Sequence, residues 1–123
     1  MRILVADDNR EIRSALHLVL TEVCPGVTIE EAGDGETARE LLRRYPLDLV
    51  LYDWDLPGLD AARFAADATE VSPCCEVIAM SGRPEARREA LLAGAGYFVG
   101  TNDPPSRLVG LLRLLLTAND TRR

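Results

Sequence analysis

Short apolar runs alternate along the chain with segments that have helical periodicity. Each run is three to six residues long and contains β-branched or aromatic residues, which is typical of buried strands. The runs cover 3–6, 27–30, 47–52, 77–80 and 97–99. Because each run precedes a helical segment, the pattern predicts five strand–helix repeats.

The helical segments carry the signals that begin helices. The first segment has apolar residues at i, i+4, i+7, i+8 and i+11 from Ile12, which form one stripe on a helix. Asn and Asp act as N-caps, and proline is favoured in the first turn. These signals predict helices that begin near Asn9, Asp34, Asp60, Pro84 and Asp103.

The order of elements predicts the fold class. Strands joined by single helices are mostly parallel, and their crossovers cover both faces of the sheet. We therefore expect an α/β domain, a doubly wound five-stranded parallel sheet with helices on both faces. Such sheets bind ligands beyond the carboxyl ends of their strands. We assign residues 1–117 to this domain and 118–123 to a polar tail or the beginning of a linker.

The charge of the chain and its basic residues exclude some classes of function. The 123 residues include 20 acidic and 14 basic ones, which gives a formal net charge of −6. An acidic domain lacks the basic face that neutralises phosphate backbones, so we expect no nucleic-acid contact by this domain itself. All the basic residues are arginine, and the chain contains no lysine. Any mechanism that needs a lysine ammonium is therefore excluded.

The cysteines and the apolar runs indicate the compartment. The three cysteines are an odd number, and Cys74 and Cys75 are adjacent, which is poor geometry for a disulfide framework. The apolar run at 3–6 is too short for a signal-peptide core or a membrane span. We predict a cytoplasmic chain that does not enter a membrane.

Acidic residues follow two of the predicted strands directly. Asp7 and Asp8 come after the first strand, and Asp53 comes after the third with Asp55 two residues on. Like charges that are held together need a raised pKa or a bound cation. Carboxylate ligands with open water positions suit Mg²⁺. The alternative is that strand-end aspartates simply cap helices, which is less favoured for a pair and a third at matching strand ends.

Four blocks of sequence resemble the receiver domain of two-component response regulators. The blocks are 3–9, 48–60, 78–82 and 93–99, and the resemblance extends from Arg2 to about Thr117. It implies the flavodoxin-like receiver fold and a signalling switch that works by phosphorylation. It also implies that the domain is not a free-standing enzyme and catalyses at most phosphotransfer to its own Asp53.

The resemblance assigns roles to residues at the sheet edge. Asp53 is implied as the phosphoacceptor, and Asp7, Asp8 and Asp53 with the backbone carbonyl of Asp55 as the Mg²⁺ ligands. Ser81, which ends the fourth strand, is implied as the hydroxyl that binds the phosphoryl oxygen and switches with it.

Further roles follow from the same resemblance. Tyr97 is implied as the aromatic residue whose rotamer reports the change. The implied partners are a sensor histidine kinase or phosphotransfer protein, which donates the phosphoryl group, and an output domain or partner protein.

The sequence departs from receivers at one position that matters. Receivers carry a lysine just after the fifth strand, and that position falls on Gly100 or, from another anchor, on Thr101. Arg83 is a possible substitute cation, which either reaches the phosphoryl group or pairs with Asp55. The missing lysine also favours an alternative, a degenerate receiver that acts as a phosphorylation-independent protein-interaction module.

Two further features keep other interpretations open. The last helix is unusually apolar, with Val109, Leu114 and Leu116 outside its core stripe, which favours a partner surface and a possible homodimer through this helix. Asp53 and Asp55 also resemble the Asp-x-Asp pair of haloacid-dehalogenase-type phosphatases, although that family places the pair on its first strand and normally uses a lysine.

Overall fold

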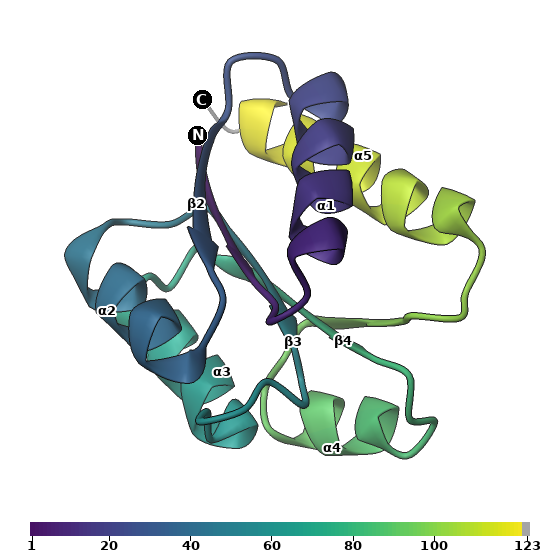
Figure 1. The fold of residues 1–123 in the computed structure, drawn as a ribbon. Coiled ribbons are helices and arrows are strands. Elements are labelled where there is room, and N and C mark those ends of the chain that lie inside the picture. Colours follow the sequence, from purple (N-terminus) through teal and green to yellow (C-terminus); the bar gives the residue numbers. More distant parts are fainter. Residues whose placement is uncertain (122–123) are drawn as a thin grey trace.

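In the computed structural model, the described part of the chain is the backbone of residues 1–121 and the side chains of residues 1–116. Within it, strands and helices alternate strictly (Figure 1). The strands are β1 (Arg2–Ala6), β2 (Thr28–Ala32), β3 (Leu49–Asp53), β4 (Glu76–Ser81) and β5 (Tyr97–Gly100). The helices are α1 (Arg10–Val23), α2 (Gly35–Arg44), α3 (Ala61–Val71), α4 (Ala86–Leu92) and α5 (Pro105–Thr121). The predicted five strand–helix repeats are confirmed.

All five strands are parallel, in the order β2-β1-β3-β4-β5. After β2 the chain crosses to the other side of β1, so the strand order reverses between β1 and β3. This arrangement confirms the doubly wound sheet. It also places the reversal point, where such sheets bind ligands, beyond the ends of β1 and β3.

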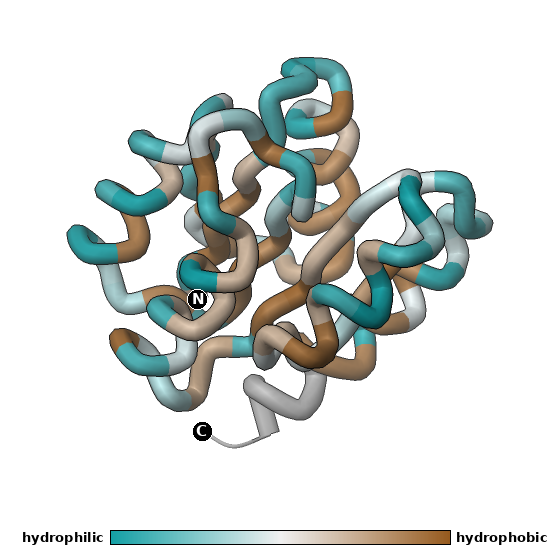
Figure 2. Tube along the Cα trace, turned by 90° about the horizontal axis from the view of Figure 1, so that it is seen from below, coloured by the Kyte–Doolittle hydropathy of each residue, from teal (hydrophilic) through white to brown (hydrophobic). Residues whose placement is uncertain are grey.

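Side chains alternate between two cores, one on each face of the sheet. Leu4 of β1 and Val50 of β3 pack against α2, α3 and α4, whereas Ile3 and Leu49 pack against α1 and α5. Figure 1 shows the two helical layers, and Figure 2 shows apolar stretches in the middle of the molecule with polar and apolar positions alternating around the helices. Because both of their faces are covered, the central strands β1 and β3 are continuous apolar runs in the sequence, whereas the edge strand β2 carries Glu30 and Glu31.

The helices begin where the side-chain signals predict, with two exceptions. Asn9, Asp34 and Asp60 each accept hydrogen bonds from backbone N–H groups in the first turns of α1, α2 and α3. By contrast, α4 begins at Ala86, two residues after Pro84. Asp103 does not cap α5, because its carboxylate accepts the N–H of Gly100 instead.

The C-terminal end differs from the predicted polar tail. The helix α5 continues to Thr121, so residues 118–121 extend this helix, and residues 122–123 lie outside the described part of the chain. Leu116, predicted as part of an extra apolar face, is buried against the sheet, and Leu114 is 67% exposed. Among the helices that the structure describes, none has the length and apolar character needed to cross a membrane.

Candidate functional site

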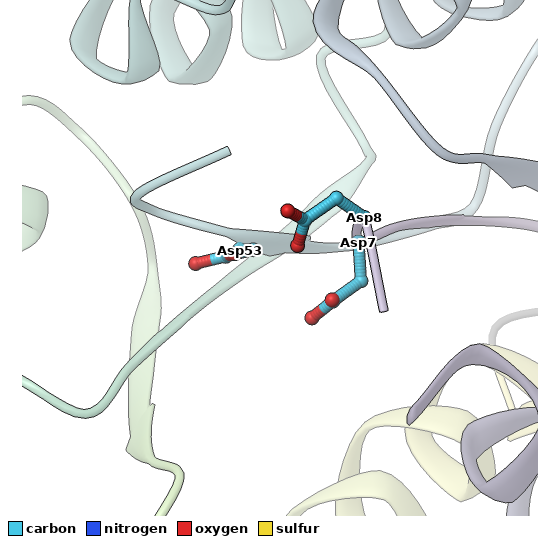
Figure 3. Close-up of side chains that lie close together, drawn as sticks. All are labelled: Asp7, Asp8 and Asp53. Carbon is cyan, nitrogen blue, oxygen red and sulfur yellow. The ribbon is translucent and has the colours of Figure 1, made fainter. Parts of the chain in front are cut away.

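Three carboxylates meet beyond the ends of two neighbouring strands. Asp7 and Asp8 follow β1, and Asp53 is the last residue of β3. Ala6 pairs with Tyr52 in the parallel register, so the residues that follow them come side by side. One carboxylate oxygen from each aspartate lies within 4.8 Å of the others. Figure 3 shows the three side chains close together. The three carboxylates therefore converge at this edge of the sheet, as the sequence predicts.

Backbone N–H groups orient two of the three carboxylates. Asp7 Oδ1 accepts the N–H of Asn9 at 2.8 Å, and the Asp7 N–H donates to the Ala32 carbonyl of β2 at 3.0 Å. Asp53 Oδ1 accepts the N–H of Asp55 at 2.9 Å. These short local bonds fix each side chain in its loop without supplying a positive charge.

Burial and neighbouring negative charges raise the pKa of two of these carboxylates, Asp7 and Asp53. Burial raises the pKa of Asp53 above its ordinary value, the Asp55 N–H opposes this, and the charges of Asp7, Asp55 and Asp8 raise it further. Asp7 is only 6% exposed, and burial raises its pKa as well, with the Asp8 charge adding to the effect.

This donor set fits a hard divalent cation. Mg²⁺ takes carboxylate and carbonyl oxygens and keeps part of its water shell, and Asp7, Asp8 and Asp53 offer oxygens at an open edge. A bound cation would also offset the mutual repulsion that the raised pKa values express.

A second polar group lies beside the first and is centred on Asp55. The Ser81 hydroxyl donates to Asp55 Oδ2 at 2.6 Å, and Arg83 donates from Nε and Nη2 to Asp55 Oδ1 at 3.0 and 2.8 Å. The Arg83 N–H in turn donates to Ser81 Oγ at 3.0 Å. Burial raises the pKa of Asp55, but the hydrogen bonds from Arg83 and Ser81 outweigh it, so the pKa lies below its ordinary value.

Of the two positions proposed for Arg83, the structure shows the pairing with Asp55. Among the described residues, no side-chain cation is bonded to Asp53, whose pKa is raised rather than lowered. Ser81 likewise bonds Asp55 and not Asp53. Both groups thus bond Asp55, although Ser81 directly follows Met80, the partner of Asp53 in the sheet.

Gly100, one of the two candidates for the position where receivers carry lysine, has an acidic neighbour. Gly100 ends β5, and its N–H donates to Asp103 Oδ2 at 2.9 Å. A Cβ at Gly100 would lie 3.1 Å from Asp103 Oδ1, and Arg107 pairs with the same carboxylate at 3.5 Å. This contact is not among the sequence predictions. An Asp three residues after Gly100 does have the spacing of a turn in which the Asp side chain bonds a nearby backbone group.

Tyr97 is half-buried in β5 and packs against the core on the α1 and α5 face. Its ring lines a hollow of about 370 Å³ together with Arg87, Leu91 and Leu111. The side chain therefore has space beside it at the edge of the sheet.

Comparison with known proteins identifies the family. The sequence profile described as "Response regulator receiver domain" matches residues 3–113. The chain belongs to this family, whose members are phosphorylation-based switches of two-component systems. The match sets aside the phosphatase interpretation of Asp53 and Asp55.

Solved structures have the same fold. The signal receiver domain of the DNA-binding response regulator merR from Colwellia psychrerythraea 34H superposes with a TM-score of 0.85 at 22% identity, over 95% of this chain and 98% of that one. The response regulator TrrA from Thermotoga maritima, solved in complex with Mg²⁺-BeF, has a TM-score of 0.79 at 26% identity, over 93% and 97%.

The curated relatives are longer proteins. The glycerol metabolism activator of Pseudomonas putida is 28% identical over 121 residues, which are 96% of this chain and 55% of that protein. The transcriptional activator protein ExaE of Pseudomonas putida is 31% identical over 121 residues, 97% of this chain and 56% of that protein. The chain thus spans about half the length of these relatives.

Proposed function

We propose that this domain is a phospho-accepting switch in which Asp53 receives the phosphoryl group and Mg²⁺ is the cofactor. The observation that carries the proposal is the meeting of Asp7, Asp8 and Asp53 at the reversal point of the sheet. Asp7, Asp8 and Asp53 would hold the metal with the backbone carbonyl of Asp55. When bound, Mg²⁺ neutralises phosphoryl oxygens and carboxylates, which is most of what phosphoryl transfer requires.

The donor is a phosphohistidine on a sensor histidine kinase or phosphotransfer protein, or a small acyl phosphate. An ionised Asp53 oxygen attacks phosphorus in line with the leaving group, and a new phosphorus–oxygen bond forms. With phosphohistidine the phosphorus–nitrogen bond breaks and its electron pair returns to the imidazole, whereas with an acyl phosphate the bridging phosphorus–oxygen bond breaks and a carboxylate leaves. Asp53 is oriented for this step by the N–H of Asp55.

Ser81 and Arg83 exchange partners after transfer in this proposal. Both now bond Asp55: Ser81 is the last residue of β4, the strand next to β3, and Arg83 lies in the loop that follows it. The phosphoryl group is a stronger acceptor than the Asp55 carboxylate, since it carries more charge and more oxygens. Arg83 then supplies the cation that lysine supplies elsewhere in the family, and Tyr97 takes up the rearrangement through the hollow beside it.

Intact-mass measurement tests the proposal directly. The protein is incubated with Mg²⁺ and acetyl phosphate, and a single phosphoryl adduct is expected on the wild type and not on Asp53→Ala. Asp67→Ala, which removes an exposed carboxylate of α3 far from the site, is the matched control and should keep the adduct. No adduct under saturating donor, or an adduct that survives Asp53→Ala, would refute the proposal.

A second candidate is the degenerate receiver, which acts as an interaction module without phosphorylation. It is favoured by the engagement of Arg83 with acidic residues and by the acidic neighbour of Gly100. Introducing lysine at Gly100 or Thr101 discriminates the two. A strong gain in phosphorylation supports the degenerate state, and an already efficient reaction that the lysine leaves unchanged removes its basis.

The names of the relatives suggest the output. Two of them are activators about twice the length of this chain, so we propose an output domain or partner protein that reads the switch in the cytoplasm.

We also propose a homodimer through α5, on which Leu114 is an exposed apolar residue. Sedimentation of the wild type and of Leu114→Ser, with and without beryllofluoride, tests the dimer.

A further inference from the structure

A ring of hydrogen bonds connects the phosphoacceptor loop to α4. The Trp54 indole N–H donates to Glu89 Oε1 at 3.0 Å, and Arg83 Nη2 donates to the same oxygen at 3.3 Å. Arg83 Nη2 also donates to Asp55 Oδ1 at 2.8 Å, and the Asp55 N–H donates to Asp53. Because Trp54 follows Asp53 in the chain, the ring begins and ends at the phosphoacceptor.

Trp54 is the buried side chain in this ring of hydrogen bonds. Trp54 is 8% exposed and lies against Tyr52 with 6.0 Å between ring centroids. A buried indole N–H needs an acceptor, and here Glu89 supplies it. The hydrogen bond from Trp54, followed by that from Arg83, holds the pKa of Glu89 below its ordinary value.

The helix that carries Glu89 has few other polar anchors. The helix α4 is seven residues long, and its N-cap residue Glu85 makes no side-chain capping bond. Glu85 pairs instead with Arg83 at 3.2 Å. Arg83 is therefore held by three carboxylates, of which Glu89 is bonded to the buried Trp54 and Asp55 to the buried Ser81.

Arg83 has room to leave this position. Its side chain is 43% exposed, and it lines a hollow of about 280 Å³ beside Ser81, Gly82 and Gly100. The hollow exists partly because both glycines lack side chains. The guanidinium can consequently move without repacking either core of the domain.

We propose that Glu89 is a positioning residue that holds Arg83 on Asp55 and away from the phosphoacceptor, with Trp54 as its anchor. The inference rests on the proposed function, since Arg83 acts there as the cation for the phosphoryl group. Glu89 contacts no reacting atom and works only through Arg83. Removing its charge frees Arg83 to reach the phosphoryl group earlier in the transfer.

The test is a double-mutant cycle on the rate of phosphorylation by acetyl phosphate with Mg²⁺. Glu89→Gln keeps an oxygen for Trp54 and loses the charge that holds Arg83. We expect it to raise the rate about two- to fivefold, the factor that one exposed ion pair corresponds to. In an Arg83→Met background the same substitution is expected to have no effect, because there is no guanidinium to release.

Two more variants test whether the faster reaction comes from the release of Arg83 or from the loss of any negative charge near the site. Glu11→Gln removes an exposed charge of the first turn of α1, near the acidic edge, which makes no pair with Arg83. It should leave the rate unchanged if repulsion of the anionic donor is not the cause. Trp54→Phe removes the N–H that anchors Glu89, and we expect a gain in the same direction that also vanishes in the Arg83→Met background.

The outcomes distinguish the inference from the proposed function. If the wild type takes up no phosphoryl group, the proposed function fails and the inference falls with it. If the wild type is phosphorylated but Glu89→Gln reacts at the wild-type rate, only the inference is wrong. It is also wrong if the gain persists without Arg83, or if Glu11→Gln gives the same gain.

Discussion

Replacing Asp53 by asparagine is expected to stabilise the metal-free protein at neutral pH. The substitution removes one of the carboxylates that meet beyond β1 and β3 and keeps an oxygen that can accept the N–H of Asp55. The raised pKa values of Asp7 and Asp53 show that their ionised forms oppose folding there. The ionised carboxylate of Asp53 therefore lowers the stability of the metal-free folded protein.

The size of the gain follows from the geometry. Two unit charges about 5 Å apart repel by about 0.8 kcal/mol in bulk water and about 3 kcal/mol at an effective dielectric of 20. Asp7 is buried and Asp53 is half-buried, so the pair lies between these limits. We expect Asp53→Asn to raise the unfolding free energy by about 1–2 kcal/mol, which is roughly 3–10 °C in Tm for a domain of this size.

The sign of the pH dependence of the unfolding free energy tests whether the ionised carboxylates are the cause of the gain. The unfolded carboxyl groups titrate near 3.8, whereas the folded ones keep their protons to higher pH. The folded state therefore binds more protons just above pH 3.8, and its stability falls as the pH rises through that window. Asp53→Asn should make this fall shallower, so the gain over the wild type should be large at neutral pH and small near pH 3.8.

Urea unfolding in EDTA, followed from pH 4 to pH 8, measures both effects. Added Mg²⁺ should stabilise the wild type and should stabilise Asp53→Asn less, since ligand binding to the folded state adds to its stability. Asp67→Asn, which removes an exposed partner of Arg63, is the control and should change little. The reasoning is refuted if Asp53→Asn is no more stable than the wild type at pH 7, or if its gain does not change with pH.

Two predictions concern the scaffold of the site, and urea unfolding measures each. Gly35→Ala should destabilise by about 1–3 kcal/mol, because the added Cβ would overlap the Gly58 carbonyl, whereas Gly110→Ala in α5 meets no atom and should stabilise by about 0.5–1 kcal/mol. An equal effect of the two alanines would contradict this account. Tyr52→Phe should cost about 1 kcal/mol, because the buried hydroxyl donates to the Ala61 carbonyl at 2.8 Å, and an unchanged midpoint would show that this bond contributes nothing.

The sheet and its acidic edge follow from short-range patterns. The central strands β1 and β3 are continuous apolar runs because both of their faces are covered, and the carboxyl ends of parallel strands meet at one edge. These two facts are enough to bring Asp7 and Asp53 together before any coordinates are known. The N-caps at Asn9, Asp34 and Asp60 were predictable for a similar reason, since they bond within their own first turns.

The long-range and loop contacts of Trp54 and Asp103 are not predictable in this way. Trp54 and Glu89 are 35 positions apart and no periodicity connects them. Asp103 has the sequence features of a helix cap, but its carboxylate accepts the backbone N–H of Gly100. In each case a polar side chain has several acceptors or donors within reach, and the packing of the loops decides among them.

The pairing of Arg83 with Asp55 has a consequence for the kind of signal the domain can receive. The hydrogen bonds to Asp55, and next those to Glu89, raise the pKa of the guanidinium, while the pKa of Asp55 is lowered. Both partners consequently stay ionised far to either side of neutrality. A lysine in such a place can lose its proton or be acetylated, whereas an arginine keeps its charge. The ion pair between Arg83 and Asp55 is therefore insensitive to cellular acidity, and under the proposed function it opens for a competing anion, the phosphoryl group.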